Sequence, residues 1–136
     1  MLRILPHAPL FSLLAVALAL SMSGCGKVEG PPRYRVSGHV TFQGKPVPGG
    51  SIIFTPDTQK GNAGPQGTAR IINGSYDTTE AGRGTVGGPH QVHVIATDSS
   101  LAEDAELVGP LAEHTFDIEF PQEATVQNLE IPKSKK

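Results

Sequence analysis

The sequence VSGHVTFQGKPVPGGSIIFTP, which spans residues 36–56, decides the fold class of this chain. Apolar side chains recur at every second position in its first part, a spacing that places them on one face of a β-strand. We expect this strand to cover residues 34–42, with four residues on its inner face: Tyr34, Val36, Val40 and Phe42.

The second half of the same stretch predicts a turn and another strand. Gly44 permits positive φ and Pro46 fixes φ, which is typical of a tight turn. Gly49 and Gly50 let the chain swing into the next strand without a Cβ clash. That strand is expected at residues 51–55, where Pro56 ends it.

The remaining sequence continues the same pattern of short strands and turns. Asn73-Gly74 is a strong signal for a type I′ hairpin turn. In the segment 90–96 the inner face is expected to hold Val92, Val94 and Ala96, whereas Val126 falls out of phase and indicates a bulge near the C-terminus. The further strands are predicted at residues 68–72, 75–79, 90–96, 116–120 and 125–131.

Between these strands, residues 97–114 form the least regular part, with a possible helical turn at 101–108. Seven short strands separated by turns predict an all-β domain of the β-sandwich type.

The composition is consistent with such a domain and excludes some functions. The chain has 16 glycines, 12 prolines, no tryptophan and one cysteine, so no disulfide within the chain can staple the fold. Outside the short tail Lys133–Lys136 no cluster of lysine or arginine occurs. A nucleic-acid-binding surface needs a basic face, so no nucleic-acid partner is expected.

The N-terminal residues 1–24 have the features of a cleaved secretory signal peptide. Arg3 precedes an apolar run at residues 10–20, and small residues follow it. The run is shorter than the ~20 apolar residues that a transmembrane helix needs.

The sequence Met22-Ser23-Gly24-Cys25 resembles the lipobox of bacterial lipoproteins. The resemblance implies cleavage before Cys25, attachment of diacylglycerol to its thiol and usually acylation of the new amino terminus. Two or three acyl chains anchor a protein to a membrane effectively permanently, whereas one holds it only marginally. The expected partner of Cys25 is therefore a membrane, with the protein exported and facing the periplasm or the cell surface.

Residues 36–56 also resemble the opening of carboxypeptidase regulatory-like (transthyretin-like, prealbumin-type) domains, whose pattern is roughly V-x-G-x-V-x-x-x-G-x-P-x-x-G-x-x-V-x-F. Residues 69–76 are similar to the hairpin of that family, and residues 88–94 to its G-x-Y-x-V-x-V strand. The resemblance covers most of residues 34–131 and implies a seven-stranded Greek-key β-sandwich. It also implies a non-catalytic role, with no cofactor.

Two positions depart from patterns in that fold group. The family usually has tyrosine at the position of His90, with the ring packed inside and the hydroxyl bonded to nearby backbone. One enzymatic branch, which hydrolyses 5-hydroxyisourate, requires a C-terminal Tyr-Arg-Gly-Ser, whereas this chain ends in residues Ile131–Lys136. The sequence therefore excludes that branch.

Histidines and acidic residues give weak signals for a metal site. His90 and His93 are three apart and point to opposite faces of a strand, so they cannot chelate together. His93 could meet His39 if their strands are neighbours, and His114 could join from a loop. Polar surface or partly buried histidines are the more common case, and no metal site is expected.

Other candidate sites have simpler structural explanations. The acidic residues Glu103, Asp104 and Glu106 lack the pattern of a calcium loop. Asp117 and Glu119 share the outward face of a strand, as solvent-facing alternation also produces. The glycine-rich segment 82–88 lacks the features of a phosphate-binding loop, and no nucleophile elbow occurs. No catalytic residue is therefore expected.

The predicted layout is a signal peptide (1–24), a lipidated Cys25 with a tether (25–33), the β-domain (34–131) and a basic tail (132–136). The expected function is that of a non-enzymatic, membrane-anchored lipoprotein that displays an interaction domain in the bacterial envelope. One alternative is a carbohydrate- or cell-wall-binding module, which would normally expose aromatic rings. Another is a subunit of an envelope complex that pairs through an edge strand, with Ile53 and Ile95 as an outward apolar patch.

Overall fold

The computed structural model describes residues 30–98 and 110–133, and these form an all-β domain. The strands are β1 (Val36–Phe42), β2 (Lys45–Pro46), β3 (Gly49–Pro56), β4 (Gly67–Ile72), β5 (Ser75–Asp77), β6 (Gly82–Arg83), β7 (Gly88–Thr97), β8 (Ala112–Phe120), β9 (Thr125–Val126) and β10 (Leu129–Ile131). A single 3-10 turn at Thr58–Lys60 is the only helical element among the described residues.

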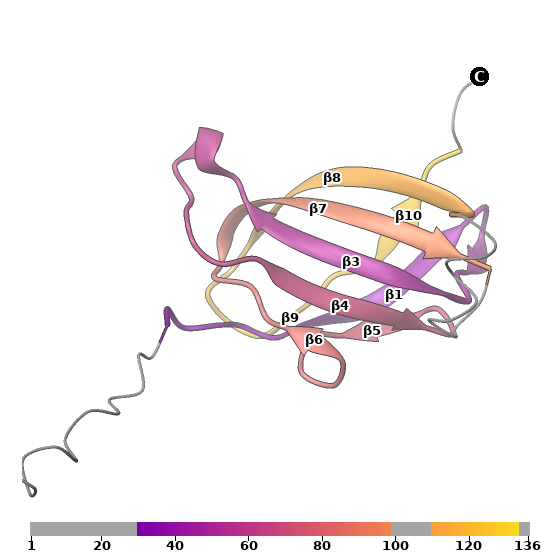
Figure 1. Cartoon of the computed structure of the whole chain (residues 1–136), viewed down its shortest axis with the longest axis horizontal. Coiled ribbons are helices and arrows are strands. Elements are labelled where there is room, and N and C mark those ends of the chain that lie inside the picture. The colour runs from indigo at the N-terminus through magenta and orange to yellow at the C-terminus, as the bar shows by residue number, and fades with distance from the viewer. Residues whose placement is uncertain (1–29, 99–109, 134–136) are drawn as a thin grey trace, which may run out of the picture. The chain divides into compact units, whose positions relative to one another are not determined.

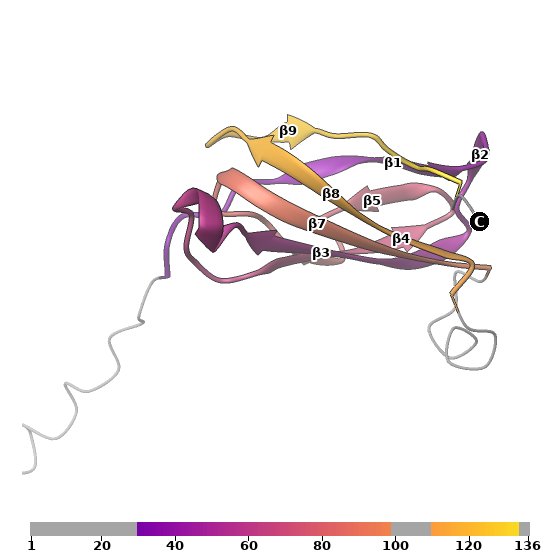
Figure 2. The same ribbon diagram turned by 90° about the horizontal axis from the view of Figure 1, so that it is seen from above.

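The strands form one curled sheet with the order β10-β1-β5-β4-β3-β7-β8, to which β2, β6 and β9 add short pairings (Figure 1). All pairings are antiparallel except those of β1 with β9 and β10. The curl brings β8 and β10, the two ends of the strand order, into contact. Figure 2 shows β1 and β9 on one side of the molecule and β3 on the other.

The inside of the curl is an apolar core. Phe54 lies at its centre and packs against the rings of Tyr76 and Phe120, with centroid distances of 6.3 and 5.7 Å. Alternate residues of each long strand supply the rest of the core, as period-two patterning requires. The buried apolar residues are Val36, Val40, Val47, Ile52, Phe54, Ala69, Ile71, Tyr76, Val92, Val94, Ala96, Phe120, Leu129 and Ile131.

Two hairpin turns have the backbone that the sequence leads us to expect. Asn73 and Gly74 both have positive φ, 48° and 78°, which confirms the predicted type I′ turn between β4 and β5. Gln43 and Gly44 also have positive φ and join β1 to β2. The turn predicted after β1 therefore occupies two residues, and Pro46 already belongs to the returning strand.

The predicted bulge near Val126 is not present. Val36 pairs with Thr125 and Val40 pairs with Leu129, so both strands advance by the same number of residues between the two pairings. Val126 is exposed because it occupies an outward position of a regular alternation, in which Leu129 and Ile131 point inward. The C-terminal segment is instead two short strands that run parallel to β1.

The two strands on either side of residues 99–109 are longer than the sequence predicts. β7 extends to Thr97, and β8 begins at Ala112, four residues before its predicted start. The added part of β8 pairs with the end of β7, up to Ala96 opposite Ala112. Long-range pairing thus extends a strand whose own residues gave no strand signal, whereas the helical turn predicted at 101–108 lies outside the described residues.

Polar contacts attach the loop 57–66 to the sheet. Asp57 accepts a hydrogen bond from the backbone of Gln59 (3.0 Å) and so caps the 3-10 turn. The side-chain amide of Asn62 donates to the carbonyl oxygens of Gly87 (2.9 Å) and Pro89 (2.8 Å). The loop is therefore bound to the start of β7.

None of the helical structure in residues 30–98 and 110–133 is long and apolar enough to cross a membrane.

Candidate functional site

The predicted processing residues Met22, Ser23, Gly24 and Cys25 lie outside the described residues. The C-terminal end of the predicted tether lies within them and is held in place. The Arg33 guanidinium donates to the carbonyl oxygens of Gln66 (3.0 Å) and Gly84 (2.9 Å), and Tyr34 forms a β-bridge with Thr85. Any tether to residue 25 therefore begins at this end of the domain, where β1 starts.

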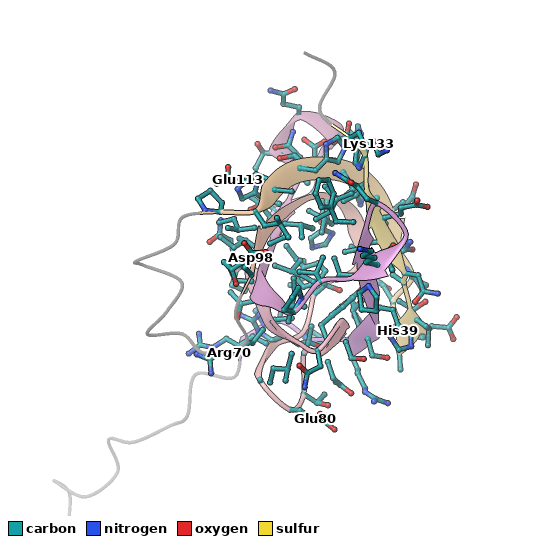
Figure 3. All side chains as sticks on the ribbon, turned by 90° about the vertical axis from the view of Figure 1, so that its right-hand side faces the viewer. His39, Arg70, Glu80, Asp98, Glu113 and Lys133 are labelled. Atoms are coloured by element: carbon teal, nitrogen blue, oxygen red, sulfur yellow. The ribbon has the colours of Figure 1, made fainter. Side chains whose placement is uncertain are left out.

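A groove of about 590 Å³ lies over the outer face of β5, between β1 and β4. It forms where β5 ends after three residues while its neighbours continue, and its volume is in the range of small-ligand sites, about 300–1,000 Å³. In Figure 3, His39 and Arg70 lie on opposite sides of this face, with Glu80 below them. Its lining residues are Ser37, Gly38, His39, Arg70, Ile72, Ser75, Tyr76, Asp77, Glu80, Ala81 and Val126.

An ion pair lies at one end of the groove. Arg35, which directly precedes β1, and Asp77, the last residue of β5, form a salt bridge, in which Arg35 Nε also donates to Asp77 Oδ1 (3.1 Å) and Oδ2 (3.0 Å). Asp77 Oδ1 accepts further hydrogen bonds from the backbone N–H (2.9 Å) and hydroxyl (2.7 Å) of Thr79. The hydrogen bonds from Arg35 and Thr79 together lower the pKa of Asp77 well below its usual range.

The lowered pKa of Asp77 predicts a specific pH dependence of stability. A carboxylate with a lowered folded-state pKa stabilises the fold above the ordinary pKa of about 3.9, and this contribution disappears as pH falls through the folded-state value. Asp77→Asn is therefore expected to be less stable than the wild type at pH 7, and the difference should shrink below about pH 4. Urea unfolding midpoints across this pH range measure it.

Asp117→Asn is the matched control, because Asp117 is an exposed carboxylate on β8 without a salt bridge among the described residues. It should change neither the midpoint nor its pH dependence to a comparable degree. A stability difference for Asp77→Asn that stays constant down to pH 2 would contradict the assignment.

The floor of the groove also holds a histidine–serine pair. His39 and Ser75 face each other across β1 and β5, with Nδ1 and Oγ 3.1 Å apart. A serine nucleophile needs a base that a third group orients. Within the described part of the chain no carboxylate bonds His39, so this pair is a polar contact that can bind a ligand rather than an activated nucleophile.

The sides of the groove are apolar and exposed. Ile72 is 46% exposed and Val126 is 71% exposed, and these are two of the three large aliphatic residues that the described domain exposes. Arg70 and Glu80 also line the groove, and neither has a salt-bridge partner among the described residues. Exposed apolar side chains beside unpaired charges are typical of a surface that contacts a partner.

Tyr76 connects the groove floor to the core. It is 4% exposed, and its hydroxyl donates a hydrogen bond to the backbone carbonyl of Gln127 (2.5 Å), between β9 and β10. Burial raises the pKa of the Tyr76 hydroxyl above its usual value, so the hydroxyl stays a donor at neutral pH. This contact holds the C-terminal strands against β5 across β1.

The four histidines of the described residues do not form a cluster. His39 is on β1 and His93 on β7, two strands that are not neighbours, so the predicted possibility of a pair is wrong. His114 lies on β8 and not in a loop, and it packs edge-on against Phe116 at 4.6 Å. No group of three potential metal ligands occurs within residues 30–98 and 110–133.

The His90 side chain points into the core of the domain. It is 1% exposed, packs edge-on against Phe120 at 5.4 Å, and has Nδ1 2.9 Å from the carbonyl oxygen of Gly88. Because a carbonyl oxygen only accepts, Nδ1 is the donor of this hydrogen bond. Nε2 is buried without a hydrogen-bond partner among the described residues.

Two proposed contact surfaces lose support. No aromatic residue is among the large hydrophobic side chains exposed in the described domain, and Tyr34, Phe42 and Phe116 are half-buried. Ile53 and Ile95 point outward and are half-buried. Ile53 pairs with Thr68 on β4 and with His93 on β7. Ile95 pairs with Ser51 and Glu113. This polar surround contradicts the predicted apolar patch.

The acidic residues considered from the sequence have separate positions. Asp117 and Glu119 are exposed on the outer face of β8, as the alternation predicts. Asp57 caps the 3-10 turn and also lies 3.5 Å from the amino group of Lys60. Glu103, Asp104 and Glu106 lie outside the described residues.

The sequence did not reveal the groove. Arg70 and Ile72 are outward residues of β4, and Val126 was interpreted as part of a bulge. The available signal was that two bulky aliphatic residues, Ile72 and Val126, occupy positions that alternation assigns to solvent. That they share one groove depends on the pairing of β1 with both β5 and β9.

Comparison with known protein families, curated proteins and solved structures found no match to this chain.

Proposed function

We propose that this protein is a bacterial lipoprotein, anchored through lipid on Cys25, that displays a non-enzymatic β-domain to a protein partner in the cell envelope. The observation that carries the proposal is the sequence Met22-Ser23-Gly24-Cys25 directly after a charged start and an apolar run. A lone cysteine in an exported domain has no disulfide partner, and lipidation gives its thiol a function.

The β-domain belongs, in this proposal, to the transthyretin-like Greek-key sandwiches. The strand order β1-β5-β4-β3 supports it, because three hairpin-linked strands lie beside a strand that precedes them in the chain. The turn signals in residues 36–56 and the buried ring at position 90 are further support. In this proposal, the single continuous curled sheet is a variant of the usual sandwich of two separate sheets.

The proposed mechanism is positional. Arg33 and Tyr34 fix the incoming chain where β1 starts, so this end of the domain is expected to face the membrane. The groove over β5 lies on the side of the domain and is free to meet a partner. Its exposed apolar residues, Ile72 and Val126, are aliphatic, which favours a protein partner over a glycan.

Replacing Cys25 with alanine is expected to abolish the anchor. The wild-type protein should be in the membrane fraction, with an intact mass that corresponds to loss of residues 1–24 plus acyl chains. Each buried CH₂ contributes about 0.8 kcal/mol, so two or more chains hold the protein permanently, and Cys25→Ala should carry no lipid mass. Mass spectrometry of membrane and soluble fractions checks both.

Ser23→Ala is the matched control, because it keeps a small residue beside the cleavage position and leaves the thiol in place. It should be processed and lipidated like the wild type. A wild-type protein that is soluble and unmodified after loss of its N-terminal segment would overturn the lipoprotein proposal.

A further inference from the structure

The outer edge of β8 is free of backbone partners within the described chain. β8 is the last strand in the sheet order and pairs only with β7, along nine residues from Ala112 to Phe120. It contacts β10 across the curl, but no pairing joins them. In an antiparallel ladder alternate N–H and C=O groups point away from the neighbour, so this edge presents a row of unpaired donors and acceptors.

The inner face of β8 is incompletely covered. On β7 the inward residues Val92, Val94 and Ala96 are 0% exposed. On β8 the inward residues Phe116 and Ile118 pack against the same core but are only half-buried. The seam between β8 and β10 thus leaves apolar area on the inner side of the free edge.

The outer face of β8 is acidic. Glu113, Asp117 and Glu119 alternate with the inward residues and are all exposed. None of the three forms a salt bridge among the described residues. The free edge therefore combines an apolar inner side, an unpaired backbone and a negatively charged outer side.

We infer that this edge accepts an extended segment of a partner protein in which apolar residues alternate with lysine or arginine. Strand addition provides affinity through main-chain hydrogen bonds, and alternate side chains provide specificity. The apolar residues of the added strand would cover Phe116 and Ile118, and its cations would meet Asp117 and Glu119. The inference rests on the proposed role as an interaction domain, and it names the chemistry of the partner.

The charge of β8 argues against a second copy of this chain as the added strand. Pairing of two β8 edges would place acidic residues of one copy beside those of the other. Like charges directly opposite in a sheet are destabilising. A basic partner strand removes this repulsion and also gains attraction that steers association.

The test uses the whole processed protein, purified from cells, and a fluorescently labelled peptide of nine residues in which lysine alternates with valine. A second peptide replaces each lysine with glutamate. Two further peptides are N-methylated at every second residue, one in each of the two possible registers. In a strand added antiparallel to β8 only one set of alternate N–H groups faces β8, so one N-methylated peptide should bind more tightly than the other.

The matching protein variants reverse the charge at two places. Asp117→Lys changes the outer face of β8, and Asp98→Lys makes the same net change at an exposed position outside β8 and outside the groove over β5. We expect the first to weaken binding of the lysine–valine peptide by about tenfold or more and to improve binding of the glutamate–valine peptide. We expect the second to change affinity by less than about twofold, because an exposed charge more than a Debye length from the cations of the bound peptide is largely screened.

Amide hydrogen exchange of the complex should show new protection in residues 112–120. Equal binding of both N-methylated peptides would overturn the inference, as would equal weakening by the two protein variants. New protection around the groove over β5 in place of β8 would also overturn it, and so would a dimer that excludes the peptide in sedimentation. Failure here would leave the lipid on Cys25 unaffected, because that result comes from the mass of the protein alone.

Discussion

Replacing Gly50 with alanine is expected to prevent stable folding of the domain. Gly50 lies in β3 between β4 and β7 and has φ of 135°, where residues with a side chain are strained. A β-carbon at this position would overlap the carbonyl oxygen of Ile95 on β7. Relief requires the two strands to separate, so we expect a loss of about 4 kcal/mol or more, a large part of the ~5–15 kcal/mol of a typical domain.

Gly44→Ala is the control that separates backbone strain from steric overlap. Gly44 also has positive φ, 75°, but an added β-carbon there meets no atom within 4 Å. Its expected cost is about 1–2 kcal/mol, from the left-handed backbone alone. Urea unfolding followed by circular dichroism measures both variants, and equal losses for the two would refute the steric explanation.

Replacing Phe54 with alanine is the second change with a large expected effect. Phe54 is 0% exposed and packs against the rings of Tyr76 and Phe120, so it connects the core residues of β3 with those of β5 and β8. Deleting a fully buried phenylalanine side chain costs about 3–5 kcal/mol, because apolar contacts are lost and a cavity remains. The midpoint of urea unfolding should fall accordingly, with little change in its slope.

Val126→Ala provides the matched control for an apolar deletion at the surface. Val126 is 71% exposed, so its removal is expected to change the free energy of unfolding by less than about 0.5 kcal/mol. The same variant removes one side of the groove and is useful for partner capture. A loss of stability similar to that of Phe54→Ala would mean that Val126 is covered in solution.

Local patterns in the sequence predicted most of the strands. The alternation in residues 90–96 correctly placed Val92, Val94 and Ala96 inside, and the Asn73-Gly74 pair correctly indicated a type I′ turn. Both signals depend on neighbouring residues only. Strand ends were less accurate, since Ala112 becomes part of β8 only through its pairing with Ala96.

The candidate site could not be predicted in the same way. The groove brings together residues from β1, β4, β5 and β9, and its residue Val126 was given a different structural role from the sequence. The outward apolar patch predicted at Ile53 and Ile95 instead has polar neighbours, and these neighbours come from other strands. His93 and Glu113 lie beside these two residues only after β7 pairs with β3 and β8.

The sequence by itself determined the all-β class, the main hairpin turn and the inward positions of the central strands. These properties follow from φ preferences and from period-two alternation, which act within a few residues. Only the tertiary structure decided the curl of the sheet, the groove over β5 and the free edge of β8. They depend on contacts between distant segments, such as the hydrogen bond from the backbone N–H of His39 to the side-chain oxygen of Asn128, 89 positions away. Such contacts are selected by the packing of the whole core, so no single segment encodes them.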